Sequence, residues 1–205
     1  MTKKSDWKKK KKQIMLDYNL SSEFYDQRYM EIQKEKYELI LENLISNPKL
    51  NLKAGILLDA GCGTGLLHQY LMKSMKQKDF KNFHYIGMDI SINMLTQFRL
   101  KLSKQNLDKK ADLLLSDIEH LPIRNSVIDI LFCITSLQNL PGIDKGISES
   151  FRTIKNGAIV NFSVLKKKFK ISTFKEKIEK MMTDKIFLNI DGVEDIIYMG
   201  RASKE

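Results

Sequence analysis

The 205-residue sequence has few cysteines and no long apolar run. Its two cysteines, Cys62 and Cys133, lie inside apolar stretches. This argues against a disulfide-stapled secreted protein and for a reducing compartment. No stretch approaches the roughly 18 to 20 apolar residues that span a bilayer, and too few apolar residues follow the N-terminal lysines for a signal peptide. We therefore expect a cytoplasmic protein that makes no use of a membrane.

The positive charge of the sequence is concentrated at its N-terminus. The formal net charge is +10, and the first twelve residues hold seven lysines against one acidic residue, Asp6. A block of like charge repels itself and usually stays solvated. We predict a basic, disordered tail over residues 1–12 that aids solubility. The alternatives are a targeting signal, or a contact with RNA or an acidic protein that is shared with the lysines of Lys166–Lys170.

After this tail, one long segment has the apolar spacing of a helix. Apolar residues recur mostly three to five positions apart from Phe24 to Ser46, and Pro48 ends the pattern. We expect residues 13–50 to form an N-terminal helical cap with one face to bury.

The remaining sequence alternates short apolar runs with amphipathic segments, which predicts an α/β fold. Strands joined by helices pair in parallel, whereas the short link Ile190–Glu194 allows only an antiparallel hairpin. The predicted strands are Gly55–Asp59, His84–Met88, Asp112–Ser116, Val127–Cys133, Ala158–Val164, Lys185–Asn189 and Asp195–Gly200. The predicted helices after the cap are Gly65–Lys76, Ile92–Ser103, a weak turn at Ile118–Leu121, Ile143–Lys155 and Thr173–Met182.

A glycine-rich turn, Asp59-Ala60-Gly61-Cys62-Gly63-Thr64-Gly65, follows the first predicted strand and precedes a predicted helix. This arrangement aims backbone N–H groups and the positive end of a helix dipole at a ligand. The turn departs from the dinucleotide fingerprint because Leu66 takes the third glycine position. It also lacks the Lys-Ser or Lys-Thr of a phosphate-binding P-loop.

Two carboxylates indicate which ligand this turn would bind. Asp59 immediately precedes the glycines, where it would repel a pyrophosphate and attract an ammonium group. Asp89 follows the second predicted strand, where a carboxylate can accept two hydrogen bonds from a ribose diol. We infer a ligand that combines a nucleoside with an amino-acid end.

Five segments between about residues 53 and 165 carry motifs in a fixed order: Leu57–Gly65, Gly87–Leu95, Ser116–Pro122, Ser126–Asp129 and Phe151–Gly157. Together they resemble the class I S-adenosylmethionine-dependent methyltransferases, in particular the group similar to ubiquinone-biosynthesis methyltransferases. The resemblance implies one three-layer, Rossmann-like methyltransferase domain over residues 51–205, with a seven-stranded, mostly parallel sheet and an antiparallel last strand. It also implies an enzyme that moves a methyl group by in-line displacement to an acceptor, which could be RNA, protein or a small molecule.

The resemblance assigns roles to individual residues as well. The methionine part of S-adenosylmethionine would be held at Asp59, Gly61, Cys62 and Gly63, the ribose by Asp89, and the adenine by Ile90, Met94, Asp117 and Ile118. Thr135 would lie near the sulfonium, and Tyr25 and Arg28 would close over the cofactor. The candidate acceptor-binding residues are Ser136, Gln138 and Asn139. Taken alone, an aspartate after a strand could equally be a helix or turn cap.

The sequence shows no evident general base. Many family members carry a histidine near the positions of Gln138 and Asn139, and this chain does not. A base is needed only if the nucleophile must first lose a proton, so its absence does not exclude activity, and the sequence assigns no catalytic residue. A non-catalytic subunit that binds S-adenosylmethionine or a partner protein is the alternative. No histidine has trustworthy metal-ligand spacing, and we predict no metal.

Overall fold

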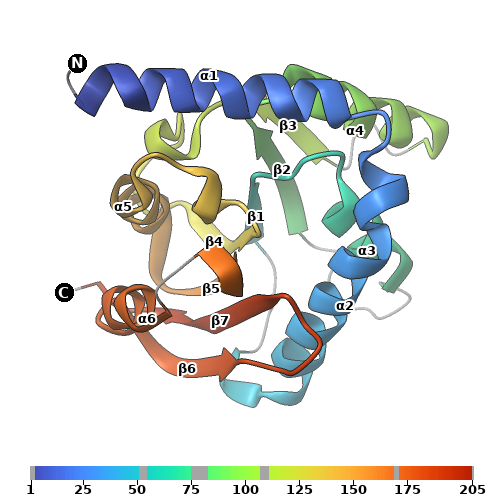
Figure 1. Ribbon diagram of the computed structural model, residues 1–205. Helices are drawn as coiled ribbons and strands as arrows, with labels where there is room; N and C mark the ends of the chain where they lie inside the picture. The colour runs from blue at the N-terminus through green and yellow to red at the C-terminus, as the bar shows by residue number, and fades with distance from the viewer. Residues whose placement is uncertain (1–2, 51–54, 75–82, 107–110, 169–170, 205) are drawn as a thin grey trace.

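The computed structural model describes residues 3–50, 55–74, 83–106, 111–168 and 171–204, and these contain a seven-stranded sheet (Figure 1). The strand order is β3-β2-β1-β4-β5-β7-β6. Strands β1 to β5 pair in parallel, and β7 is antiparallel to both of its neighbours, β5 and β6. The predicted parallel sheet with an antiparallel last strand is confirmed. The strands are β1 (Gly55–Ala60), β2 (Phe83–Asp89), β3 (Ala111–Leu115), β4 (Ile128–Ile134), β5 (Ile154–Leu165), β6 (Met182–Leu188) and β7 (Asp195–Ala202).

Helices cover both faces of the sheet and complete the three predicted layers. One core cluster includes Ile40 of α2 and Phe98 of α4, and the other includes Phe151 of α5 and Ile178 of α6. Among the described residues, no helix has both the length and the apolarity to cross a bilayer. The helices are α1 (Lys3–Ser21), α2 (Tyr25–Ser46), α3 (Leu66–Ser74), α4 (Ile92–Lys104), α5 (Ile143–Thr153) and α6 (Ile171–Glu179), with 3-10 turns at Pro48–Leu50, Ile118–His120, Leu137–Asn139 and Lys166–Lys168.

Two strands, β5 and β6, begin three or more residues earlier than the sequence predicts. β5 begins at Ile154 rather than Ala158, so the preceding helix ends before its predicted limit at Lys155. Gly157 has a φ of 74° and the pairing of β4 with β5 shifts register nearby. This irregularity interrupts the apolar pattern that should have marked the start of the strand. β6 likewise begins at Met182, in place of the predicted end of a helix, and its pairing with β7 is also irregular.

The lysine-rich N-terminal segment is helical, so the prediction of a disordered tail is wrong for its described residues. Helix α1 lies across the sheet edge where β1, β2 and β3 end (Figure 1). Lys10 Nζ donates to the backbone oxygen of Leu140 at 3.0 Å, and Lys11 forms ion pairs with Asp117 and Glu119. Lysine itself favours helix, and these distant partners offset the charge repulsion on which the prediction rested. A local sequence pattern could not reveal them.

Candidate functional site

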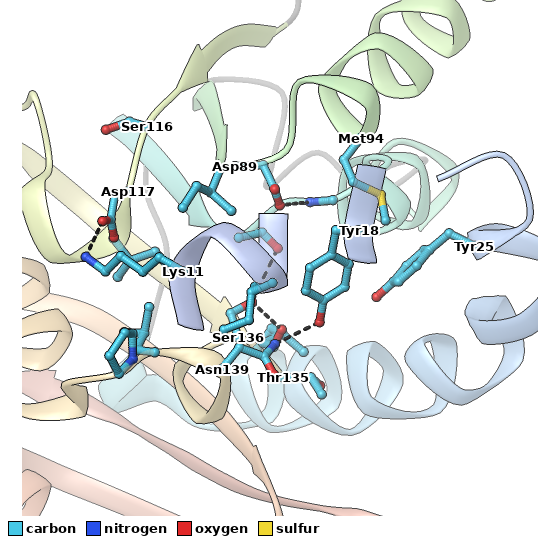
Figure 2. Close-up of a pocket in the computed structure, with 18 residues that line it drawn as sticks. Lys11, Tyr18, Tyr25, Asp89, Met94, Ser116, Asp117, Thr135, Ser136 and Asn139 are labelled. Atoms are coloured by element: carbon cyan, nitrogen blue, oxygen red, sulfur yellow. Dashed lines mark hydrogen bonds and ion pairs between the residues drawn. The ribbon is translucent and has the colours of Figure 1, made fainter. Parts of the chain in front are cut away.

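Two adjoining cavities lie at the carboxyl edge of the parallel strands. The first is bounded by the glycine turn after β1, by the ends of β2 and β3, and by the segment after β4, with α1 across it (Figure 2). The second lies between α1, α2 and the segment after β4. Molecules bound in the two cavities would therefore meet at the residues that line both. These shared residues are Ile14, Tyr18, Tyr25, Thr135 and Asn139.

The glycine turn places bare backbone against the first cavity. The N–H groups of Gly61 and Cys62 both donate to the backbone oxygen of Met88, at 2.7 and 2.9 Å, which ties the turn to β2. Gly61 has a φ of 86°, and a Cβ there would overlap the side chain of Ser136. Glycine is therefore required at this position, and it lets the chain after β4 approach the turn closely.

Asp89 connects the glycine turn to helix α4. One carboxylate oxygen accepts the N–H of Gly63 at 2.9 Å (Figure 2), and the other accepts the N–H of Ser91 at 2.8 Å. Burial raises the pKa of Asp89, and these backbone bonds act in the opposite direction. Each carboxylate oxygen can accept a further hydrogen bond. Asp89 also lines the first cavity, so a ligand with two adjacent hydroxyls could bind there.

Asp59 and Cys62 do not line the first cavity, although both were predicted to bind the cofactor. Asp59 is 3% exposed and accepts a hydrogen bond from the Tyr85 hydroxyl. Burial raises the pKa of Asp59 to about 7, the nearby charge of Asp89 adds to the rise, and the Tyr85 bond opposes it. Burial likewise raises the pKa of the Cys62 thiol. Both side chains therefore lie behind the turn and support it from the core.

The four residues predicted to contact adenine come together in the first cavity. Ile90, Met94, Asp117 and Ile118 all line it, beside Gly61, Gly63 and Asp89. Burial would raise the pKa of Asp117, but the ion pair with Lys11 and a hydrogen bond from the Glu119 N–H hold it below its usual value. Lys11 was not predicted as a site residue, because its position in a lysine run gives no sign of its partners.

The residues predicted near the acceptor divide between the cavities. Ser136 lines the first, Gln138 the second, and Thr135 and Asn139 line both. Asn139 Nδ2 donates to the Tyr18 hydroxyl at 2.7 Å (Figure 2). Burial, together with the charge of Asp89, raises the pKa of Tyr18 to about 12.

The predicted closing residues of the N-terminal helix also differ in position. Tyr25 lines both cavities, as a residue that closes over the cofactor could. Arg28 lines only the second cavity, and its guanidinium lies 5.2 Å from the centre of the Tyr29 ring. Among the described residues, no three His, Cys, Asp or Glu side chains group as metal ligands would, and the absence of a metal stays a prediction.

A buried polar cluster beneath Thr135 was missed from the sequence. Lys36 Nζ lies 2.8 Å from both Thr135 Oγ1 and Asp195 Oδ1. Asp195 Oδ2 accepts hydrogen bonds from Thr135 Oγ1 and Ser163 Oγ, each at 2.7 Å. The sequence carries one signal of it, because Lys36 shares a helix face with the apolar Ile40 four residues later.

Comparison with known proteins agrees with this geometry. A family model described as a methyltransferase domain matches residues 58–162. Malonyl-[acyl-carrier protein] O-methyltransferase of Hamiltonella defensa is 31% identical over 115 residues, which are 56% of this chain and 40% of that protein. Ubiquinone/menaquinone biosynthesis C-methyltransferase of Bartonella tribocorum is 30% identical over 100 residues, 49% of this chain and 37% of that protein. The chain thus spans less than half the length of these curated relatives.

A solved structure shows the same fold at low identity. Magnesium protoporphyrin IX methyltransferase of Synechocystis, determined with bound S-adenosylmethionine, superposes with a TM-score of 0.72 and 16% identity, covering 95% of this chain and 97% of that one. The family match covers half of the chain and includes the glycine turn, Asp89 and Asp117. The chain belongs to the methyltransferase domain family.

Proposed function

We propose that this chain transfers a methyl group from S-adenosylmethionine, bound in the first cavity, to an acceptor bound in the second. The observation that carries the proposal is the convergence of Asp89, Asp117 and the glycine turn on one cavity. Asp89 suits a ribose diol and Asp117 suits the amino group of adenine. Ile90 and Met94 offer apolar contact to the ring. The same cavity would oppose a pyrophosphate, because its described lining residues include the two carboxylates of Asp89 and Asp117 and one lysine, Lys11.

The bound cofactor would supply a methyl group already activated by the positive charge on sulfur. The protein then has to orient donor and acceptor and exclude water, which can lower a barrier by ~7 to 11 kcal/mol. Helix α1 would exclude water, because it lies across the first cavity (Figure 2). Tyr18 and Tyr25 would orient donor and acceptor, because they line both cavities.

The second cavity has the features of a site for an acceptor with hydrogen-bond donors. Gln33 and Gln138 line it, and their side-chain oxygens are buried and have no hydrogen-bond partner among the residues that the structure describes. A buried acceptor atom without a partner is costly, and an N–H or O–H group of a bound molecule would satisfy it. Aromatic side chains, including Phe24 and Tyr29, complete the wall. We propose a small molecule, or the end of a larger one, as the acceptor.

Contact with an acidic partner is a further part of the proposal. Lys8, Lys9 and Lys12 of α1 are exposed, as are Lys167 and Lys168, and Lys168 lines the second cavity. Such lysines could attract the phosphates of RNA or an acidic protein, while Lys170 of the predicted lysine run lies outside the described residues.

Cys62 and Cys133 are free and buried, which is compatible with the cytoplasmic location that we propose.

Calorimetry tests the proposal directly. S-adenosylmethionine and S-adenosylhomocysteine should both bind with one site per chain, and nicotinamide adenine dinucleotide should not. Binding of the dinucleotide alone would contradict the cofactor assignment. A coupled assay for S-adenosylhomocysteine released on candidate acceptors then separates an enzyme from a non-catalytic subunit, which would bind the cofactor and release none.

A further inference from the structure

An ion pair is buried at the wall between the two cavities. Lys36 of α2 is 2% exposed and Asp195, the first residue of β7, is 1% exposed. Their charged atoms are 2.8 Å apart, and the hydroxyl of Thr135 bonds to both. Lys36 lines the second cavity and Thr135 lines both. The pair is therefore linked through one hydroxyl to the place where donor and acceptor would meet.

Thr135 has a backbone conformation that needs support. Its φ is 55°, in the left-handed region that is unfavourable for a β-branched residue. The Thr135 N–H donates to the backbone oxygen of Ser163 at 3.0 Å, and its side chain bonds to Lys36 and Asp195. Strain of this kind persists where the surroundings enforce it, often at functional sites. The cluster thus holds Thr135 in a fixed position at the shared wall.

Anchoring of α2 does not by itself explain a buried pair. Removing two charges from water is costly, and a buried ion pair is weak evidence for added stability. Helix α2 has another ion pair to the domain, between Asp26 and Lys101, whose side chains are 25% and 18% exposed. That pair lines neither cavity. The Lys36–Asp195 pair differs from it in burial and in its position beside both cavities.

We infer that the Lys36–Asp195 pair keeps the electrostatic potential at Thr135 balanced, so that loss of either charge alone shifts the preference of the site between positively charged S-adenosylmethionine and its neutral product. This inference rests on the proposed function, because a methyl group that is to reach the second cavity must face the shared wall. The two ligands differ at the sulfur by one methyl group and one positive charge. Lys36 and Asp195 largely cancel each other there, whereas either charge alone would act strongly in a buried setting.

The ratio of the dissociation constants of S-adenosylmethionine and S-adenosylhomocysteine measures this effect, since all other contacts of the two ligands are shared. Lys36→Gln leaves the carboxylate of Asp195 unbalanced, so the ratio should fall about tenfold. Asp195→Asn leaves the ammonium of Lys36 unbalanced, so the ratio should rise about tenfold. The double variant, Lys36→Gln with Asp195→Asn, has neither charge at this position, so its ratio should lie within about twofold of that of the parent.

Lys101→Gln is the matched control, because it breaks the ion pair between Asp26 of α2 and Lys101 of α4. A purely structural effect changes both dissociation constants by the same factor and leaves their ratio constant. If a single variant fails to fold by circular dichroism, Ser163→Ala replaces it. This change keeps the ion pair and removes one hydroxyl from Asp195 Oδ2, and should lower the ratio about twofold to threefold.

Folded variants whose ratios match that of the parent overturn the inference and leave the proposed function intact. A parent protein that binds neither ligand overturns the proposed function itself.

Discussion

The carboxylate of Asp89 offers the sharpest test of the proposed cofactor site. It holds the N–H groups of Gly63 and Ser91 at 2.9 and 2.8 Å and faces the first cavity. Loss of a charged hydrogen bond to a ligand costs ~1.5 to 3 kcal/mol, which weakens binding by roughly 10- to 150-fold. Release of the glycine turn acts in the same direction. Asp89→Ala should therefore weaken S-adenosylmethionine binding by at least about tenfold.

Calorimetric titration of the parent and Asp89→Ala proteins measures this change. The matched control is Asp129→Ala, because Asp129 also holds a backbone N–H, that of Ile56 at 2.9 Å, and pairs with Lys155 at 2.7 Å. Asp129 lines neither cavity, so its loss should lower stability and leave affinity unchanged. An Asp89→Ala protein that is folded and binds within about twofold of the parent would show that Asp89 does not hold the ribose.

Three further changes test the support around the site. Lys11→Met removes the counter-ion of Glu119, whose side chain is 1% exposed. The free energy of unfolding, measured by thermal denaturation, should therefore fall by ~1 kcal/mol or more. An unchanged unfolding midpoint would contradict this pairing. Burial raises the pKa of Asp59 from 3.8 to about 7, so the folded state holds a proton that the unfolded chain has lost between these values. The free energy of unfolding should then fall as pH rises through that window. Urea titrations at several pH values measure this, and an Asp59→Asn protein with the same pH dependence as the parent would refute the role of Asp59. Gly65 has a φ of 81°, and Gly65→Ala would put a Cβ into the Phe98 ring. The free energy of unfolding from chemical denaturation should fall by at least ~2 kcal/mol, and a midpoint equal to that of the parent would contradict this.

The sheet, and the convergence of Gly61, Asp89 and Asp117 on the first cavity, could be predicted from the sequence for a topological reason. A buried parallel strand such as β4 is a nearly continuous apolar run, so its position is visible in the sequence. Gly61 and Asp117 each follow a strand within two residues, and Asp89 is the last residue of β2. Because parallel strands end at one edge of the sheet, residues that are far apart in sequence come together there.

The rest of the site depends on packing between distant segments. Lys36 shares a helix face with Ile40, but only the packing of α2 against β7 shows that it pairs with Asp195. Asp195 stands at the start of a strand and carries no motif. Lys11 is one of seven lysines in the first twelve residues, and its partners lie more than a hundred residues further along the chain. No local pattern could identify the distant partners of these residues.

Helix α1 is attached to the molecule in a way that makes its position sensitive to the medium. Neither core cluster includes a residue of α1. Its contacts include the ion pair of Lys11 with Asp117, the hydrogen bond that Asn19 Oδ1 accepts from the Ser91 hydroxyl at 2.6 Å, and the ring contact of Tyr18 with Tyr25. Salt screens the charged part of this attachment, because the Debye length shrinks from ~10 Å at 0.1 M salt to ~3 Å at 1 M. We therefore expect dissolved ions to weaken the attachment of α1, and the rates at which a ligand enters and leaves beneath the helix should increase with ionic strength.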